Sequence, residues 1–544
     1  MKDYEIVVTP HTSLFIGGYA EASGQSDGDT AADRKGLLLP GSAVKGALRE
    51  AAVRLARGAG HGGQLVDHLF GRGATEEVQG TEGKLRIGPL RSTAPDEPEP
   101  MTRIHVSLDR RLKQAAPDRL FQNRVTAAGF GLRFHGVLTT LDPLTEDELG
   151  FLQAVISITD QLGAGRGRGL GLVRIELGQP LPERVLDRTG LPEAVSSVVL
   201  VLEALEPLQL AGIKDLSNYT FSKDHLDGSA LRGAVAARLP EEALEPVMGG
   251  STPACFGDGR PGGLTGIPAP LTLNQAKRGG DLQDEALALA AESLGARRWE
   301  RPRDLRRVEG TVCRNADGTW VRLQLQRRTI TRAARDYAIG KAAHGRLFSL
   351  EVVDPYLEEE ALRLYASVAG SAEQLRRIVD CARNGLYVGG DRNRGLGRLA
   401  FVEVTAEPRW PSLDERHRRW ADGLGRLGAP APESTGALLA LGPLAVDPER
   451  LRSILRSLDL EAVHGVTRRQ IHGGWISRLS LPRSVGSHYV PGSVWLVRRP
   501  DGSSALPALR RLEADGIGPG RPDGWGWLVA CHPIHLDCTK EVAL

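Results

Sequence analysis

The 544-residue chain is too long for one ordinary domain and has the length of about three to four. Hydrophobic residues make up 41% and charged residues 25%, so disordered, collagen-like and coiled-coil chains are poor fits. The net charge is only +2, because 69 basic residues balance 67 acidic ones, and charge alone does not indicate a polyanionic partner.

The cysteines and the apolar runs indicate a cellular compartment. Five scattered cysteines argue against a disulfide framework and suit a reducing environment. No apolar run approaches the roughly 20 residues that cross a bilayer, and the N-terminus lacks the pattern of a signal peptide. We therefore expect a cytoplasmic protein without a membrane partner.

Short motifs recur in the same order along the chain, which is the sign of an internal repeat. The first motif reads GSAVKGA at residues 41–47 and GSALRGA at residues 228–234, and each copy opens a helical pattern. The second motif reads RLFxxxV and begins at Arg119 and again at Arg346. The repeat predicts two modules of the same fold.

The third motif is a loop rich in glycine and arginine. It reads RGRGLG at residues 166–171 and RNRGLG at residues 392–397, and each copy leads into a strand-like segment. A related loop, GIGPGRPDGWGW, covers residues 516–527. The C-terminal segment is therefore similar to the other two in its final loop, although it lacks the first two motifs.

Proline-rich stretches at 180–192 and 408–432 are predicted to be linkers. The second copy carries roughly 40 more residues between its first two motifs, which predicts an insertion near 250–310. The predicted modules are residues 1–180, 195–405 and 433–544.

Hydrophobic periodicity predicts both strands and helices in each repeat. The expected strands cover residues 4–9, 173–177, 197–202, 346–353, 399–404 and 436–441, and the expected helices cover residues 42–57 and 359–368. With the β-α-β-β-α-β arrangement as a template, we expect an α+β chain of tandem ferredoxin-like (RRM-like) modules.

The first motif could hold phosphate groups at a helix N-terminus. Ser42 is predicted to be the N-cap, and Lys45 and Arg49 lie four residues apart on one helix face. Arg232 takes the place of Lys45 in the second copy. A capped amphipathic helix with solvated bases is the alternative.

The arginines of the glycine-rich loops are the next candidates for RNA binding. Small residues let a backbone approach a polyanion, while arginine offers forked donors to phosphate groups. A tight turn between a helix and a strand would also use glycine, so that alternative stays open. The loop candidates are Arg166, Arg168, Arg392, Arg394 and Arg521.

These motifs resemble the RAMP superfamily of CRISPR proteins, whose members have a ferredoxin-like fold with a glycine-rich loop near guide RNA. Residues 1–180 resemble the backbone subunits of type III complexes, including RIHVSLDR at 103–110, and the resemblance implies an RNA contact at His105. Residues 195–544 resemble the large RAMP protein of type III-D systems, on the basis of GGW at 473–475 and PGSV at 491–494.

The resemblance implies a guide-RNA-binding subunit of a type III interference complex, which serves antiviral defence. The implied partners are crRNA, target RNA, the large polymerase/cyclase-like subunit, the small subunit and further RAMP subunits.

The resemblance also implies chemistry in a loop before the first motif, where backbone subunits cut target RNA in a metal-dependent reaction. Asp27, Asp29 and Asp33 are the candidate catalytic residues and Mg²⁺ ligands of such an endoribonuclease. A solvated loop whose acids have no role is the alternative. Zinc is not expected, since the spacing of Cys531, His532, His535 and Cys538 matches no standard site.

Two other functions remain open from the sequence. A guide-processing endoribonuclease of the same superfamily would need an acid or base such as His11 or His344 near the scissile phosphate. A scaffold whose glycine loops bind phosphate-bearing small molecules would lie outside nucleic-acid biology, but the sequence shows no Walker-type lysine.

Overall fold

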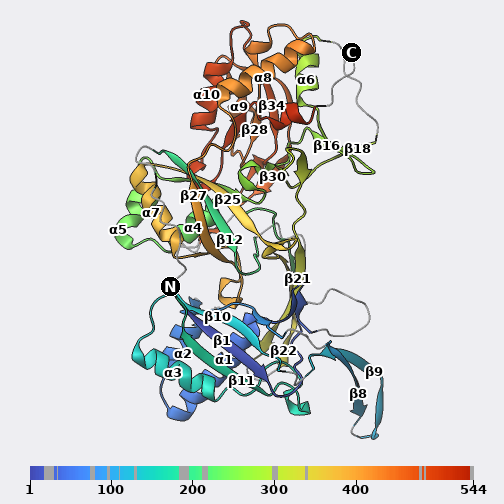
Figure 1. Ribbon diagram of the computed structural model, residues 1–544, viewed down its shortest axis with the longest axis vertical. Coiled ribbons are helices and arrows are strands. Elements are labelled where there is room, and N and C mark those ends of the chain that lie inside the picture. Colours follow the sequence, from blue (N-terminus) through green and yellow to red (C-terminus); the bar gives the residue numbers. More distant parts are fainter. Residues whose placement is uncertain are drawn as a thin grey trace.

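Three lobes stack along the long axis of the computed structural model, each around its own main sheet and core (Figure 1). We call them the N-terminal, middle and C-terminal lobes. The structure describes residues 1–17, 30–33, 35–73, 80–94, 99–109, 111–127, 131–182, 191, 195–210, 218–296, 304–336, 341–473, 475–476, 481–482 and 485–539. Within these ranges, none of the helices has the length and apolar character that a bilayer crossing requires.

The N-terminal lobe has the sheet order β11-β1-β10-β7-β3-β2, with β6 also paired to β10. Its core side chains come from alternate positions of β1 and from one face of α1, as the strand and helix periods require. The elements are β1 (Lys2–Pro10), β2 (Ala32–Asp33), β3 (Gly36–Leu39), α1 (Gly41–Ala59), α2 (Gly63–Phe70), β4 (Gly71–Arg72), β5 (Thr81–Glu82), β6 (Leu85–Ile87), β7 (Leu90–Ser92), β8 (Met101–Asp109), β9 (Gln114–Val125), β10 (Phe134–Thr140), α3 (Glu146–Ser157) and β11 (Val173–Pro180).

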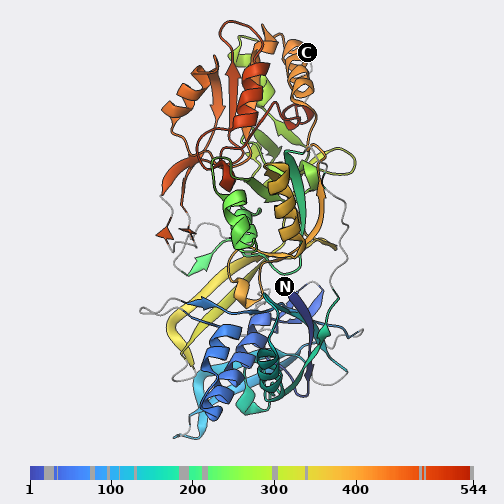
Figure 2. The same ribbon diagram turned by 90° about the vertical axis from the view of Figure 1, so that its left-hand side faces the viewer.

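The middle lobe has the sheet order β14-β25-β12-β27-β26. The long hairpin β21–β22 leaves this lobe and reaches the N-terminal lobe (Figure 2). The elements are β12 (Ser197–Ala204), β13 (Tyr219–Thr220), α4 (Gly228–Ala236), α5 (Glu241–Met248), β14 (Cys255–Arg260), β21 (Arg327–Asp336), β22 (Lys341–Val353), β23 (Tyr356–Leu357), β24 (Glu360–Ala361), β25 (Arg363–Ala369), α7 (Ala372–Arg383), β26 (Leu386–Tyr387) and β27 (Arg398–Thr405).

The C-terminal lobe has the sheet order β29-β34-β28-β35. Its elements are α8 (Leu413–Arg426), β28 (Thr435–Ala440), α9 (Pro448–Arg456), β29 (Glu461–Val466), β30 (Arg469–His472), β31 (Trp475–Ile476), β32 (Leu481–Pro482), β33 (Gly486–Tyr489), β34 (Val494–Arg498), α10 (Leu506–Asp515), β35 (Leu528–Ala530) and α11 (Ile534–Asp537).

The region of the predicted insertion near 250–310, together with the strands that directly follow it, contributes to the C-terminal core. Leu273, Leu287 and Trp320 belong to the same buried cluster as Trp420 and Leu496. The elements of this region are η2 (Gly263–Thr265), β15 (Ile267–Pro268), β16 (Leu273–Ala276), β17 (Leu282–Asp284), α6 (Ala286–Ser293), β18 (Leu305–Arg307), β19 (Thr311–Arg314) and β20 (Trp320–Arg322).

The same order of elements recurs in all three lobes: strand, helix, strand, strand, helix, strand. In each main sheet the first strand lies between the third and the fourth, and the second strand pairs with the third, as β12, β14, β25 and β27 illustrate. Neighbouring strands of these sheets are antiparallel. The mixed α+β composition expected from the sequence is confirmed.

Most of the predicted elements are present, including the helix at 42–57 and the strands at 4–9, 197–202, 346–353 and 436–441. The predicted helix at 359–368 is wrong, because this segment forms β24 and β25 and pairs with β12. The stretch at 408–432, predicted to be a linker, contains the helix α8, whose Trp420 is fully buried.

Candidate nucleic-acid interface

The three glycine-rich loops have one common backbone geometry. Each contains a single turn of 3-10 helix: η1 (Arg166–Arg168), η3 (Arg392–Arg394) and η5 (Arg521–Asp523). A left-handed glycine follows each turn, namely Gly169, Gly395 and Gly524, with φ of +80°, +80° and +91°. Only glycine adopts this conformation at no steric cost, which explains why the motif recurs with its glycine in place.

The loop of the middle lobe docks onto the N-terminal lobe. A Cβ atom at Gly395 would lie 2.6 Å from the carbonyl oxygen of Ile87 and 3.5 Å from the Cα atom of Gly41. Gly41 opens α1, and Ile87 ends β6. The helix start and the strand end together form a socket, and the left-handed glycine of the next lobe fills it.

The loop of the C-terminal lobe repeats this contact on the middle lobe. A Cβ atom at Gly524 would lie 3.0 Å from the carbonyl oxygen of Phe256 and 3.2 Å from the Cα atom of Gly228, which opens α4. The Arg232 guanidinium of α4 pairs with Asp523 of this loop at 3.2 Å. The two lobe junctions therefore have the same geometry. In each, the left-handed glycine of a loop, which we call the plug, lies against the socket of the neighbouring lobe.

The remaining loop arginines are partly open to solvent. Arg166 pairs with Glu50 of α1 at 3.2 Å, and Arg168 is exposed. Arg392 lies 3.9 Å from Glu82 of the N-terminal lobe, and Arg394 lies 3.5 Å from Asp391, with 36% and 48% of their side chains exposed. The fifth candidate, Arg521, stacks over the Trp527 ring at 5.4 Å.

The residues of the first motif are placed differently from the prediction. Ser42 is not the N-cap, because α1 begins at Gly41 and Pro40 holds the cap position. Lys45 is buried, and its ammonium donates to the Leu85 carbonyl at 2.8 Å. Burial and the Arg86 charge lower the pKa of Lys45 to about 7. Lys45 therefore lies under the socket instead of on an open surface, whereas Arg49 is half-buried.

The second motif lies on the later strand of a long hairpin in two of the lobes. The hairpin β21–β22 packs Ile330, Leu350 and Val352 against Leu38 of the N-terminal lobe. The matching hairpin β8–β9 extends away from the N-terminal lobe, as Figure 1 shows at its lower right. His105 lies on β8, half-buried, opposite Phe121 of β9.

Comparison with known proteins gives a match to a family model over part of the chain. Residues 7–174 match the family model of the RAMP superfamily. This match, called the RAMP segment below, begins within β1, ends at the start of β11 and includes the loop η1. No curated protein matches the sequence.

Solved structures with some likeness to the chain are those of type III-B Cmr-beta complexes. A chain of the complex bound to cognate target RNA and AMPPnP is 14% identical, and the match covers 55% of this chain and 86% of that one with a TM-score of 0.34. A chain of the complex in the apo state is 10% identical, and the match covers 32% of this chain and 96% of that one with a TM-score of 0.24.

The predicted acidic loop of the RAMP segment is only partly within the described residues. Asp27 and Asp29 lie outside them. The Asp33 carboxylate is nearly buried and pairs with Arg91 at 2.5 Å, while its other oxygen accepts from the Lys35 amide at 2.9 Å. A metal ion at Asp33 would have to replace Arg91.

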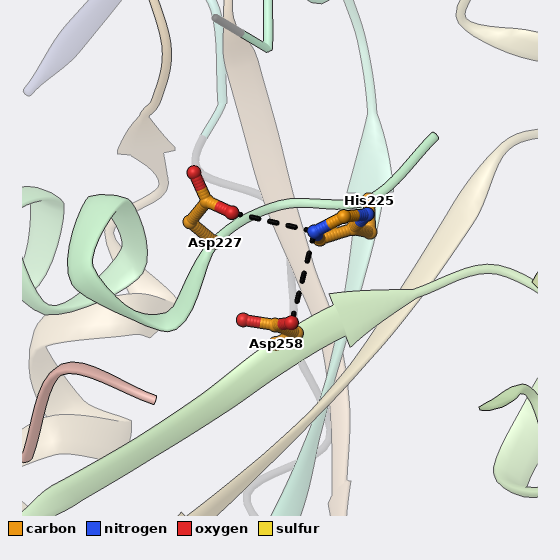
Figure 3. A group of neighbouring side chains, drawn as sticks. All are labelled: His225, Asp227 and Asp258. Atoms are coloured by element: carbon orange, nitrogen blue, oxygen red, sulfur yellow. Dashed lines mark ion pairs between the residues drawn. The ribbon is translucent and has the colours of Figure 1, made fainter. Parts of the chain in front are cut away.

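In the middle lobe, a cluster of charged side chains occupies the segment before α4, which corresponds to the acidic loop of the RAMP segment. The His225 ring lies 3.3 Å from Asp227 and 3.7 Å from Asp258 (Figure 3), and its other nitrogen lies 2.8 Å from Asp224. His225, Asp227 and Asp258 are close enough together to hold a metal ion.

The charges of this cluster are already balanced by protein groups. Lys223 pairs with Asp227 at 2.6 Å, and Arg260 lies 3.3 Å from Asp258. Burial and Arg260 oppose protonation of His225, but the neighbouring aspartates outweigh both and raise its pKa. Lys223 and Arg260 place two cationic groups among the three carboxylates, and the raised pKa of His225 favours a third.

An aromatic group from the C-terminal lobe adjoins this network. The rings of His472, His488 and Trp525 lie with centroids 5.0–5.9 Å apart. Burial is the main cause that lowers the pKa of both His472 and His488. Sequence reasoning missed this junction, although His225 and Asp227 stand directly before the second GSxxxG motif and could have marked it.

The four residues considered for zinc lie in the C-terminal core. Cys531, His532, His535 and Cys538 are all buried. The His535 ring contacts Asp284 at 3.1 Å, and burial raises the pKa of the Cys531 thiol to about 12.

Proposed function

We propose that this protein is a guide-RNA-binding subunit of a type III CRISPR interference complex, which holds crRNA and positions target RNA. The observation that carries the proposal is the RAMP match of residues 7–174, whose order of elements is repeated by two further lobes. The expected partners are crRNA, target RNA, the large and small subunits and further RAMP subunits, in the cytoplasm.

Each lobe is, on this proposal, a ferredoxin-like RAMP module. The support is the strand order of the three main sheets, which agrees with the β-α-β-β-α-β template. The N-terminal lobe is the backbone-type module, and the other two lobes correspond to a type III-D large RAMP protein.

The RNA contacts are expected at arginines that stay accessible beside the plugs and sockets. Arg168 and Arg394 are the most exposed arginines of η1 and η3, and Arg49 lies on the helix that carries the first socket. Such contacts neutralise phosphate groups and carry no sequence information, as a subunit that accepts any guide requires.

Target cleavage with Mg²⁺ is proposed for the acidic loop of the N-terminal lobe. Of its three candidates, Asp33 has an arginine partner, so the proposal depends chiefly on Asp27 and Asp29. Carboxylates that leave room for water are the ligands that Mg²⁺ prefers.

The test is purification of the tagged full-length chain from cells that carry its neighbouring genes, followed by sequencing of bound RNA. Uniform guide-length RNA is the expected result, and its absence would overturn the proposal. Target cleavage by the purified complex should need Mg²⁺ and should be lost in Asp27→Ala or Asp29→Ala. Cleavage that persists in both variants would leave only the RNA-holding role.

A further inference from the structure

The side chains around the Nε2 atom of His225 have the spacing of a metal site. This atom lies 3.3 Å from a carboxylate oxygen of Asp227 and 3.7 Å from one of Asp258 (Figure 3). Two ligands of a tetrahedral Zn²⁺ ion, each about 2.0–2.1 Å from it, lie about 3.3–3.4 Å apart. Among the described residues, no other three side chains of the histidine, cysteine or carboxylate type are grouped as closely.

A third carboxylate fixes the orientation of the His225 ring. The Nδ1 atom of the ring lies 2.8 Å from Asp224, and the other Asp224 oxygen accepts from the Thr311 hydroxyl at 2.8 Å. A carboxylate on one nitrogen of a metal-binding histidine keeps the proton on that nitrogen and leaves the lone pair of the other for the ion. Asp224 therefore holds the Nε2 atom towards Asp227 and Asp258 in the way that zinc-binding histidines are held.

The charges of the cluster match a divalent ion. Asp224, Asp227 and Asp258 carry three negative charges, and Arg260 and Lys223 balance two of them. The Lys223 side chain is 24% exposed, and its flexible stem lets the ammonium turn into solvent. With Lys223 in solvent, Arg260 and an ion of charge +2 balance the three carboxylates.

Two further imidazole groups border the cluster from the C-terminal lobe. The charges of Asp227 and Asp258 act on His472, whose ring centroid lies 5.9 Å from that of His488. His488 is 9% exposed, and neither of its ring nitrogens has a hydrogen-bond partner among the described residues. Buried polar atoms are normally paired, so this side of the cluster lacks a polar partner that a metal-bound water would supply.

We propose that His225, Asp227 and Asp258 bind Zn²⁺, and that the ion fastens the start of α4 to β14 where the middle and C-terminal lobes meet. A histidine ligand suits Zn²⁺, whereas Mg²⁺ prefers oxygen ligands. Asp258 also accepts from the Gly228 amide at 3.0 Å, so the ion would stabilise the socket that the plug at Gly524 fills. The site is separate from the four residues of the C-terminal core considered above.

The test is zinc binding by the full-length chain, purified with a tag that contains no histidine. The chain is stripped with a chelator and dialysed against a small excess of Zn²⁺ in the presence of millimolar Mg²⁺. Plasma mass spectrometry should find about one Zn²⁺ per chain, and Co²⁺ in its place should give the visible absorption of a four-coordinate site. A chain that retains no stoichiometric metal, or retains Mg²⁺ instead of Zn²⁺, would overturn the inference.

Matched variants locate the ion. His225→Gln and Asp258→Asn each remove a ligand and keep a polar side chain, so each should lower the retained zinc at least tenfold. The control is His135→Gln, because His135 also pairs with a carboxylate, Glu5 at 2.9 Å, but belongs to no such group of three. Equal zinc in the parent chain and in both cluster variants would overturn the inference.

A third variant tests the site where loss of a ligand prevents folding. Lys223→Gln removes the cation that competes for Asp227, and it should tighten zinc binding by about tenfold. Isothermal titration calorimetry measures the change, and unchanged or weaker binding would overturn the inference. Because no step of the test uses RNA, a complex without guide RNA would overturn the proposed function and leave the zinc site intact.

Discussion

At the scale of single residues, the same glycine has opposite surroundings in two copies of one motif. Gly395 approaches a carbonyl oxygen of the neighbouring lobe, and Gly169 is exposed. The sequence shows only that both copies keep a glycine, because both need a positive φ. The neighbour that each glycine meets depends on how the lobes are stacked, which the motif does not encode.

This difference predicts unequal effects of one substitution. Gly395→Ala and Gly169→Ala share a left-handed strain of about 1–2 kcal/mol. Only Gly395→Ala also forces a Cβ to 2.6 Å from the Ile87 carbonyl, which should cost about 1–3 kcal/mol more. Calorimetric unfolding of both variants checks this, and equal unfolding midpoints would contradict the socket.

A buried carboxyl at the same junction predicts a pH dependence. Glu206 lies beside Gly88 of the N-terminal lobe, and one of its oxygens finds no hydrogen-bond partner among the described residues. Burial raises the pKa of Glu206 to about 7. Because the folded state binds this proton more tightly than the unfolded state, the stability falls as pH rises from about 4.5 to 7, by up to about 3 kcal/mol.

Replacement of Glu206 by its neutral isostere should remove this loss. Glu206→Gln is expected to raise the unfolding midpoint at pH 8 and to leave it nearly unchanged at pH 4.5, where the folded state keeps the carboxyl protonated. Denaturation curves at the two pH values measure the effect. A variant that is less stable than the parent chain at pH 8 would show that the charged form is the stable one.

At the scale of elements, the errors of prediction have identifiable causes. The segment 359–368 is rich in glutamate, alanine and leucine, which favour a helix. Its buried residues nevertheless alternate, with Leu362, Leu364, Ala366 and Val368 inside, and pairing with β12 decides in favour of a strand. The period of two was present in the sequence, and intrinsic propensity concealed it.

Other features of the structure could not be predicted from sequence patterns. The burial of Lys45 under a socket depends on contacts of the helix with β6 and with the next lobe. The proline-rich stretch at 408–432 contains the amphipathic helix α8, whose packing against the inserted region needs residues more than 100 positions apart. The motifs located the loops correctly, but their role at lobe junctions appeared only in the fold.

The two hairpins provide a matched test of packing. Ile330→Ala should destabilise the isolated chain by about 2–4 kcal/mol, because Ile330 is 3% exposed in the cluster that joins the middle and N-terminal lobes. Ile104→Ala, at a side chain that is 64% exposed, should leave the stability within about 0.5 kcal/mol. Urea unfolding of both variants checks the difference, and similar losses would contradict the assigned roles.

At the scale of the whole molecule, a net charge of +2 is compatible with RNA binding because the charges are unevenly distributed. Arg168 and Arg394 lie on equivalent loops of two stacked lobes and offer donors at matching positions. Arginine contacts that repeat from one lobe to the next are suited to the repeating phosphate groups of an RNA strand.

This arrangement predicts a salt-dependent and sequence-independent loss on mutation. Arg168→Ala combined with Arg394→Ala should weaken guide-RNA binding to the same extent for unrelated guide sequences. Each lost phosphate contact should reduce the slope of log K against log salt by about 0.7. Filter binding at a series of salt concentrations measures both values, with Arg511→Ala, 70% exposed on α10, as the control. An unchanged slope would remove these arginines from the RNA interface.

The two occupied sockets have a thermodynamic consequence that follows from their being joined by one chain. A tethered plug meets its socket at an effective concentration in the millimolar range, so each internal junction can be weak in isolation and still be closed nearly all the time.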